Sequence, residues 1–117
     1  MSRGSTAFHN GMAAEDAIAR QYEARGGKVL ARRWKVRAGE IDLIIDLSGV
    51  IVFVEVKARK TVELAMAAVT PLQQARIMDC AAQYLAHHAT LESACRFDLA
   101  ATDSSGRIEI LENVFSG

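Results

Sequence analysis

The chain has 117 residues, half of them hydrophobic, and its 14 basic residues balance its 14 acidic ones. This length suits one domain, and no apolar run reaches the roughly 18 residues that a transmembrane helix needs. With no secretory signal and only Cys80 and Cys95, we expect a cytoplasmic protein with reduced thiols and no membrane association.

The N-terminal half of the sequence predicts a tail, a helix and three strands. Residues 1–10 contain Ser, Gly and Asn and are expected to form a flexible tail, so that residues 11–117 make one domain. A helix follows over about residues 12–25, and Gly26-Gly27 ends it. The alternating apolar residues of 28–36, 39–47 and 50–58 predict strands, the last two forming a hairpin around Ser48-Gly49.

The C-terminal half predicts an irregular segment over 60–69, a second helix and two strands. Thr70-Pro71 is typical of a helix start, with Thr as the N-cap. This helix runs to about His87, and its expected apolar stripe is Leu72, Ala75, Met78, Ala82 and Leu85. Strands are expected over 95–103 and 107–115. The order αβββαββ indicates an α/β fold with a central mixed sheet flanked by helices.

The hairpin sorts its charged residues onto one face of the predicted sheet. Side chains alternate along a strand, and a two-residue loop sets Leu47 opposite Val50. In that register one face of the hairpin is wholly apolar and needs a covering helix: Ile41, Leu43, Ile45, Val52, Val54 and Val56. On the other face Asp42 lies opposite Glu55, and Glu40 lies opposite Lys57. Ile44, Ile51 and Phe53 continue this second face.

Asp42 and Glu55 form an electrostatic conflict that predicts a site. Directly opposed residues have Cβ atoms about 4.5–5.5 Å apart, and like charges there repel. A shared proton or a bound cation relieves the repulsion. Oxygen ligands favour Mg²⁺ or Mn²⁺ over zinc. The alternative is a solvent-facing strand pair with unrelated charges, which the apolar neighbours on the same face disfavour.

Two further features fit a site at this place. Glu15 shares a face of the first helix with Ile18, Ala19 and Tyr22, so it belongs either to the site or to the edge of that apolar stripe. Basic residues cluster in the first half of the chain, where residues 1–60 hold 11 basic and 7 acidic side chains. Such a surface is typical of nucleic-acid-binding proteins, although a solvated basic edge has the same composition.

Four residues together match a known nuclease pattern. An acid on the first helix, an Asp on the second strand and Glu-x-Lys on the third resemble the PD-(D/E)xK nucleases, here Glu15, Asp42, Glu55 and Lys57. More closely, "GMAAE", "GEIDLI", "FVEVKAR" and "CRFDLAA" resemble the bacterial UPF0102 family, also called YraN-like. The resemblance extends from about residue 11 to residue 115. Departures are Arg33 in place of a usual Asn, and Gln73 in place of a frequent Lys.

The resemblance implies a restriction-endonuclease-like core, similar to archaeal Holliday junction resolvases, and a metal-dependent endonuclease acting on DNA. Asp42 and Glu55, with the Val56 carbonyl, would hold Mg²⁺ or Mn²⁺, and Lys57 would position water or stabilise developing charge. Glu15 would bind a second ion or hold metal-bound waters. The candidate contacts to the nucleic-acid backbone are Arg32, Arg33, Lys35, Arg37, Arg59, Lys60, Gln73 and Arg76.

Other interpretations stay open from the sequence. A nucleic-acid-binding module that has lost catalysis would carry the same basic residues. A structural protein that docks a partner through its charged face is a further alternative. The resemblance to resolvases also makes a homodimer an expectation. Arg96 and Asp98 in "CRFD" are interpreted as structural residues.

Overall fold

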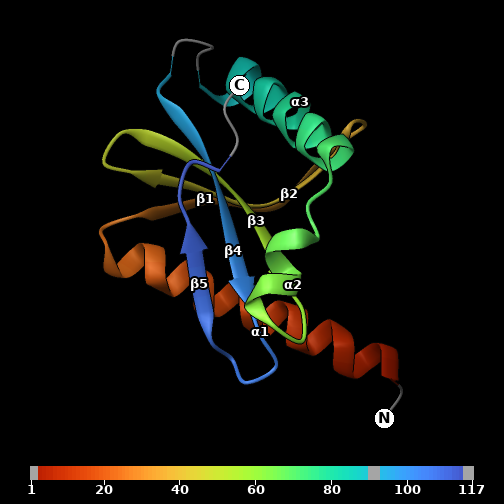
Figure 1. Ribbon diagram of the computed structural model, residues 1–117. Helices are drawn as coiled ribbons and strands as arrows, with labels where there is room; N and C mark the ends of the chain where they lie inside the picture. Colours follow the sequence, from red (N-terminus) through yellow and green to blue (C-terminus); the bar gives the residue numbers. More distant parts are fainter. Residues whose placement is uncertain (1–2, 90–92, 115–117) are drawn as a thin grey trace.

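A five-stranded mixed sheet forms the centre of the molecule, with strands in the order β1-β2-β3-β4-β5 (Figure 1). The structure, a computed structural model, describes residues 3–89 and 93–114, with side chains from residue 12 onward. Only β3 and β4 are parallel. The elements are α1 (Arg3–Ala24), β1 (Lys28–Val36), β2 (Gly39–Leu47), β3 (Val50–Ala58), α2 (Val62–Ala67), α3 (Pro71–His88), β4 (Cys95–Thr102) and β5 (Ile108–Leu111). The predicted α/β class with a mixed, helix-flanked sheet is confirmed.

The main differences from the predicted elements lie in α1, α2 and β5. Helix α1 begins at Arg3 rather than near residue 12; the flexibility expected of residues 1–10 stays a prediction, and residues 1–2 lie outside the described residues. The segment expected to be irregular contains α2, which Thr61 caps through a hydrogen bond from the Leu64 N–H. Strand β5 is shorter than predicted, and Phe115 lies outside the described residues. Within the described residues no helix is long and apolar enough to cross a membrane.

The β2–β3 hairpin has the predicted loop and register over its first half. Leu47 pairs with Val50, and the ladder continues regularly to Leu43 opposite Val54. Ser48 and Gly49 both have positive φ, 54° and 87°, as a tight two-residue hairpin turn requires. The Gly49 N–H donates to the Asp46 carboxylate at 3.0 Å, which further holds the turn. The register of this half therefore follows from the loop alone.

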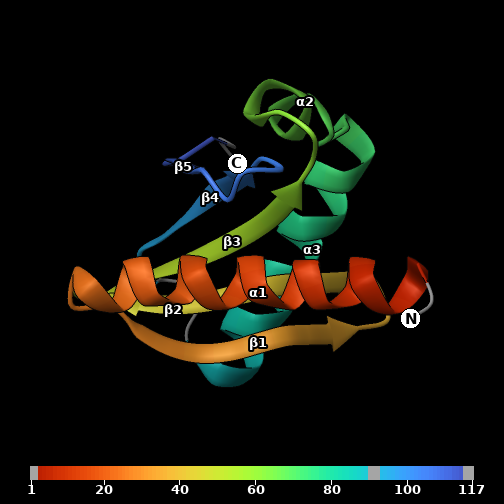
Figure 2. The ribbon, with the colours of Figure 1, turned by 90° about the horizontal axis from the view of Figure 1, so that it is seen from below.

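Helix α1 covers one face of the sheet, as Figure 2 shows. Its fully buried side chains Ile18, Ala19 and Tyr22 pack against the strand residues Leu43, Ile45, Val52 and Val54. The spacing of the three helix residues places them on one side of the helix. The need for a helix on this apolar face is confirmed, and Glu15 lies one turn before Ile18 on the same helix.

Helix α3 covers the opposite face and corrects two predictions. Its buried side chains are Ile77, Cys80, Ala81, Tyr84 and Leu85. Of the predicted stripe, Leu85 is buried and Met78 packs partly buried against the same core. The prediction is wrong for Ala75, Ala82 and Leu72, which are exposed, Leu72 by 61%. Ile41 also packs on this side, with Ile44 and Phe53, rather than with Leu43 and Ile45. Regular alternation therefore fails between Ile41 and Leu43, at the position of Asp42.

Candidate metal and nucleic-acid site

The break in alternation arises where Asp42 binds the main chain of β3. The Asp42 Oδ2 atom accepts a hydrogen bond from the Val56 N–H at 2.7 Å. In a continuous antiparallel ladder that N–H would donate to a carbonyl of β2. The regular pairing of β2 with β3 ends at Leu43–Val54, one residue before Asp42. The side chain therefore takes the place of a ladder contact, and the carboxylate is fixed at the point where the two strands separate.

Glu55 meets the Asp42 carboxylate, as the hairpin register predicts. Its side chain is only 14% exposed. Burial, a hydrogen bond to Asp42 and the Asp42 charge, in that order of size, raise the pKa of Glu55 to about 9, while Lys57 opposes the shift. Without a cation, the pair therefore shares a proton at neutral pH. A shared proton is one of the two ways, with a bound cation, in which the sequence predicts that the repulsion between Asp42 and Glu55 is relieved.

Lys57 lies beside the pair rather than opposite Glu40. Its Nζ atom is 3.7 Å from Glu55 Oε1, and its side chain is also 14% exposed. The regular β2–β3 ladder ends before the expected pair of Glu40 with Lys57. Glu40 instead pairs with Lys35 of β1 and is exposed. The predicted neighbourhood of Asp42, Glu55 and Lys57 is present, although the strands do not stay in register to form it.

Glu15 faces the same region from α1 and carries an arginine partner. Arg33 donates to Glu15 Oε2 from Nη2 at 2.9 Å and from Nε at 3.1 Å, and the Glu15 side chain is only 12% exposed. Hydrogen bonding to Glu15 is the main cause that raises the pKa of Arg33, and the charges of Glu40 and Asp42 add to it. Arg33 has a φ of 49°, a conformation uncommon outside Gly and Asn, so β1 is locally distorted where this contact forms.

The acidic residues border a small hollow. It has a volume of about 230 Å³ and is lined by Glu15, Asp42, Val56, Ala58 and Arg59. Thus α1 and β2 each contribute one of the predicted carboxylates to this hollow. Glu55 of β3 does not line it and reaches the site through its contact with Asp42. Among the described residues, no group of three or more His, Cys, Asp or Glu side chains is arranged to hold a metal ion.

The donor set still fits one hard divalent cation. Asp42 and Glu55 supply carboxylate oxygens, and the Asp42 charge disfavours the ionised form of Glu55, which a cation would relieve. Mg²⁺ is commonly held by one or two carboxylates, with waters and phosphates completing its coordination. We therefore consider Asp42 and Glu55 the metal candidates, with the Val56 carbonyl as a further oxygen.

The predicted nucleic-acid contacts are spread over several surfaces. Arg32 forms an ion pair with Asp16 of α1, next to the Arg33–Glu15 pair. The Gln73 side chain accepts from the Thr70 N–H at 3.3 Å and so completes the N-terminal capping box of α3. The remaining residues are exposed on β1 and its turn, at the end of β3 or on α3: Lys35, Arg37, Arg59, Lys60 and Arg76.

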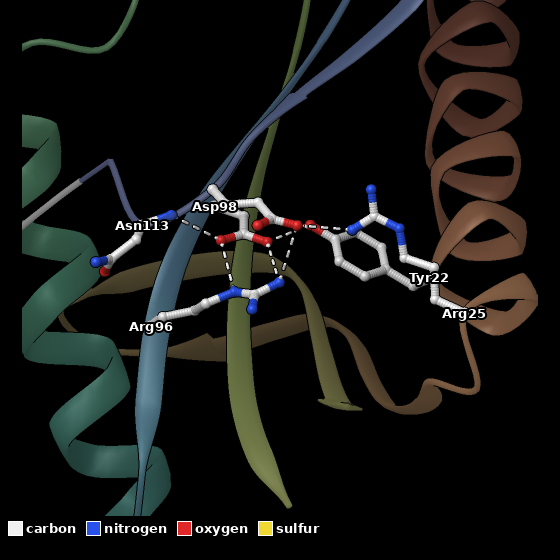
Figure 3. A network of polar contacts seen from close by, with 6 residues as sticks. Tyr22, Arg25, Arg96, Asp98 and Asn113 are labelled. Carbon is white, nitrogen blue, oxygen red and sulfur yellow. Dashed lines mark hydrogen bonds and ion pairs between the residues drawn. The ribbon is translucent and has the colours of Figure 1, made fainter. Parts of the chain in front are cut away.

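A second polar cluster, shown in Figure 3, serves packing rather than the acidic site. Asp98 is buried and accepts from Tyr22 Oη at 2.7 Å, from Arg96 Nε at 3.1 Å and from the Asn113 N–H at 3.0 Å. Burial is the main cause that raises the pKa of Tyr22, with the Asp98 hydrogen bond next. Tyr22 lies two helical turns beyond Glu15, about 10 Å along the axis. The cluster ties α1 to β4, in agreement with the structural interpretation of Arg96 and Asp98.

Sequence reasoning missed the partner of Glu15. Arg33 was assigned to phosphate contact, whereas the structure pairs it with a candidate catalytic acid. The signal was present as two adjacent acids, Glu15-Asp16, and two adjacent arginines, Arg32-Arg33, in neighbouring elements. Consecutive residues of a strand normally point to opposite faces of the sheet, so both arginines are not expected to contact the same helix. The alternation rule therefore argued against the Arg33–Glu15 pair.

Comparison with known proteins identifies relatives along almost the whole chain. The model of a family described as "Uncharacterised protein family UPF0102" matches residues 14–102, which include Glu15, Asp42, Glu55 and Lys57. The chain is 40% identical to a UPF0102 protein of Roseobacter denitrificans, covering 97% of this chain and 88% of the relative. It is 42% identical to one of Cereibacter sphaeroides, covering 97% of both chains. A UPF0102 protein of Ralstonia nicotianae is 43% identical over 90% of this chain and 85% of the relative.

Proposed function

The chain belongs to the UPF0102 family, and from its acidic site we propose that it is a divalent-metal-dependent endonuclease that hydrolyses phosphodiester bonds of DNA. The observation that carries this proposal is the half-buried pair of Asp42 and Glu55 beside Lys57, with Asp42 also lining an open hollow. The carboxyl pair can exchange its proton for a bound cation, and the Lys57 ammonium group lies beside it. Together these groups can place positive charge around a phosphodiester, which is an anionic ester, during its hydrolysis.

The side chains divide the work of such a reaction. When bound, a divalent cation would lower the pKa of a coordinated water and polarise the scissile phosphate. The Val56 N–H fixes the orientation of Asp42, so that this carboxylate needs no reorganisation to bind the cation. Glu55 gives up its proton on binding, because two ionised carboxylates are tolerated only around a positive charge. Lys57 places a positive charge beside the reacting phosphate, where negative charge develops.

Cleavage assays with matched variants test the proposal. Supercoiled, branched and single-stranded DNA would be incubated with the protein and Mg²⁺ or Mn²⁺. We expect Asp42→Asn and Lys57→Ala each to lower the cleavage rate by about a hundredfold or more, because each removes charge that acts on the transition state. Asp79→Asn, an exposed acid on α3, should leave the rate unchanged. Cleavage that persists in both site variants, or no cleavage of any substrate, contradicts the proposal.

A nucleic-acid-binding module without catalysis is the second candidate. It is favoured by one observation, that the described residues contain no cluster of three possible metal ligands. A titration with Mn²⁺ separates the two candidates. A nuclease should bind Mn²⁺ in a manner that Asp42→Asn abolishes, whereas a pure binding module should bind DNA with no such metal affinity.

A further inference from the structure

A larger hollow adjoins the acidic site. Its volume is about 630 Å³, and Ala58 and Arg59 line both this hollow and the acidic one. We call it the side groove. Its walls come from three places far apart in the sequence: Ala13 and Ala17 of α1, Lys60 after β3, and Ser104 and Gly106 in the turn between β4 and β5. A molecule bound at Asp42 could therefore extend directly into it.

The walls of the side groove are tied together by hydrogen bonds. The Arg59 N–H donates to the Thr102 carbonyl at 3.1 Å. The Lys60 carbonyl accepts from both the N–H and the hydroxyl of Ser104, each at 3.4 Å. These contacts join the end of β3 to the β4–β5 turn. The groove is therefore part of the folded framework and needs no rearrangement to form.

Its chemistry combines an apolar wall with positive charge. Alanines of α1 and Ile108 give an apolar surface, while Arg59 and Lys60 stand exposed at the end of β3. The Arg59 guanidinium donates to the Ala58 carbonyl at 2.8 Å, at the boundary between the two hollows. The Asp103 carboxylate, which also lines the groove, accepts from the Ser105 and Arg107 N–H groups of its own turn, both at 2.9 Å.

A nucleotide has the complementary chemistry, with an apolar base face and an anionic phosphate. Pockets of roughly 300–1,000 Å³ hold ligands of small-molecule size, so the groove has room for about one nucleotide and none for a double helix. A base in a duplex must break its base pair and its stacking contacts to enter such a space, which costs free energy. A base that is already unpaired avoids this cost.

We propose that the side groove binds one unpaired nucleotide adjoining the phosphate at Asp42 and Glu55. The protein would then prefer nucleic acids that offer an unpaired strand over an intact duplex. This inference rests on the proposed function, because it takes the acidic hollow as the place of the scissile phosphate. It adds a substrate preference and a binding surface on α1 and the β4–β5 turn.

Binding measurements without cleavage test the groove directly. The full chain carrying Asp42→Asn would be titrated, in the presence of a chelator, into an intact DNA duplex and into the same duplex with a single-stranded arm. We expect about tenfold tighter binding to the armed duplex, because its bases enter the groove without unpairing. Ala13→Trp and, separately, Ser104→Trp should fill the groove and abolish the preference. Ala24→Trp, exposed on the same helix outside the groove, should retain it.

The outcomes separate this inference from the proposed function. The groove is overturned if the protein binds both DNAs with equal affinity. It is also overturned if the preference survives both groove substitutions in variants with unchanged melting temperature. In either case, cleavage by the wild-type chain would still support the nuclease. A preference lost only in the groove variants, in a protein that cleaves nothing, supports the groove and contradicts the nuclease. Absence of any DNA binding by the Asp42→Asn variant overturns the groove, and the cleavage assay alone then decides the nuclease.

Discussion

Glu55 makes the folded chain sensitive to pH through a single side chain. Burial and Asp42 raise its pKa from 4.5 to about 9, so between these values the folded protein holds a proton that the unfolded chain releases. Stability from this group is fully present below pH 4.5 and falls as the pH rises towards 9, by at most about 1.4 kcal/mol per pH unit. Chemical denaturation of the metal-free protein across this range would measure the slope.

The variant Glu55→Gln isolates that contribution. A neutral amide has no proton to lose, so we expect its stability to depend less on pH than that of the wild type over the same range. Glu23→Gln, which replaces an exposed acid of α1, is the matched control and should keep the wild-type slope. If Glu55→Gln and wild type show parallel curves, Glu55 is ionised in the folded protein and the proton-sharing pair does not exist.

Arg33 places a positive charge where a metal ion would also interact. It forms an ion pair with Glu15, and the negative charges of Glu40 and Asp42 also raise its pKa. We expect Arg33→Asn to raise the affinity for Mn²⁺ by about tenfold, because one repulsive charge is removed from the acidic site. Asn tolerates the positive φ at this position, so the backbone is preserved. Isothermal titration calorimetry with Mn²⁺ would measure the change.

Arg32→Ala is the control for this comparison. Arg32 carries the same charge but pairs with Asp16, an acid that does not line the acidic hollow. Its removal should leave Mn²⁺ affinity nearly unchanged. An equal effect of both substitutions would mean that only the general charge of the surface matters, and weaker binding in Arg33→Asn would mean that Arg33 instead holds Glu15 in place for the metal.

At the level of elements, the hairpin shows what local sequence determines. The two-residue loop sets the register as far as Leu43–Val54, so the next pair expected along the strands is Asp42 with Glu55. The regular ladder stops before this pair, yet the two carboxylates still interact. Local sequence was therefore sufficient to predict the contact between the two acids, but not the backbone that forms it. The predicted face of Ile41 is wrong because the Val56 N–H donates to the Asp42 side chain and the regular alternation of β2 is interrupted there. Residue spacing along the sequence does not predict this contact between the two strands.

The helices show where spacing is ambiguous. Helix α3 has apolar residues on more than one side, and only the shape of the sheet selects Ile77, Cys80 and Tyr84 over Leu72. In the same way, the left-handed backbone of Arg33 has no local sequence signal, since Arg rarely adopts it. The order of the strands and the two longer helices and the contact between the two acids were therefore predictable, although the short helix α2 was missed. The face of α3 and the partner of Glu15 depend on tertiary packing.

For the whole molecule, net charge is zero, so binding to nucleic acid depends on where the basic residues stand. Arg25 and Arg32 are ion-paired with Glu112 and Asp16. Arg59 and Lys60 are exposed at the end of β3, where Arg59 lines both hollows and Lys60 lines the side groove. The latter pair is therefore placed to replace counterions on a phosphate backbone that reaches Asp42.

The salt dependence of binding measures this placement. Each phosphate contact contributes about 0.9 to the slope of log affinity against log salt on duplex DNA, so Arg59→Ala with Lys60→Ala should lower the slope by about 2. The charge-matched double variant Arg25→Ala with Arg32→Ala should change the slope much less, because these arginines already have acidic partners in the protein. Fluorescence anisotropy over a salt series would measure both slopes. Equal losses in the two double variants would show that DNA responds to total charge and has no defined path past the end of β3.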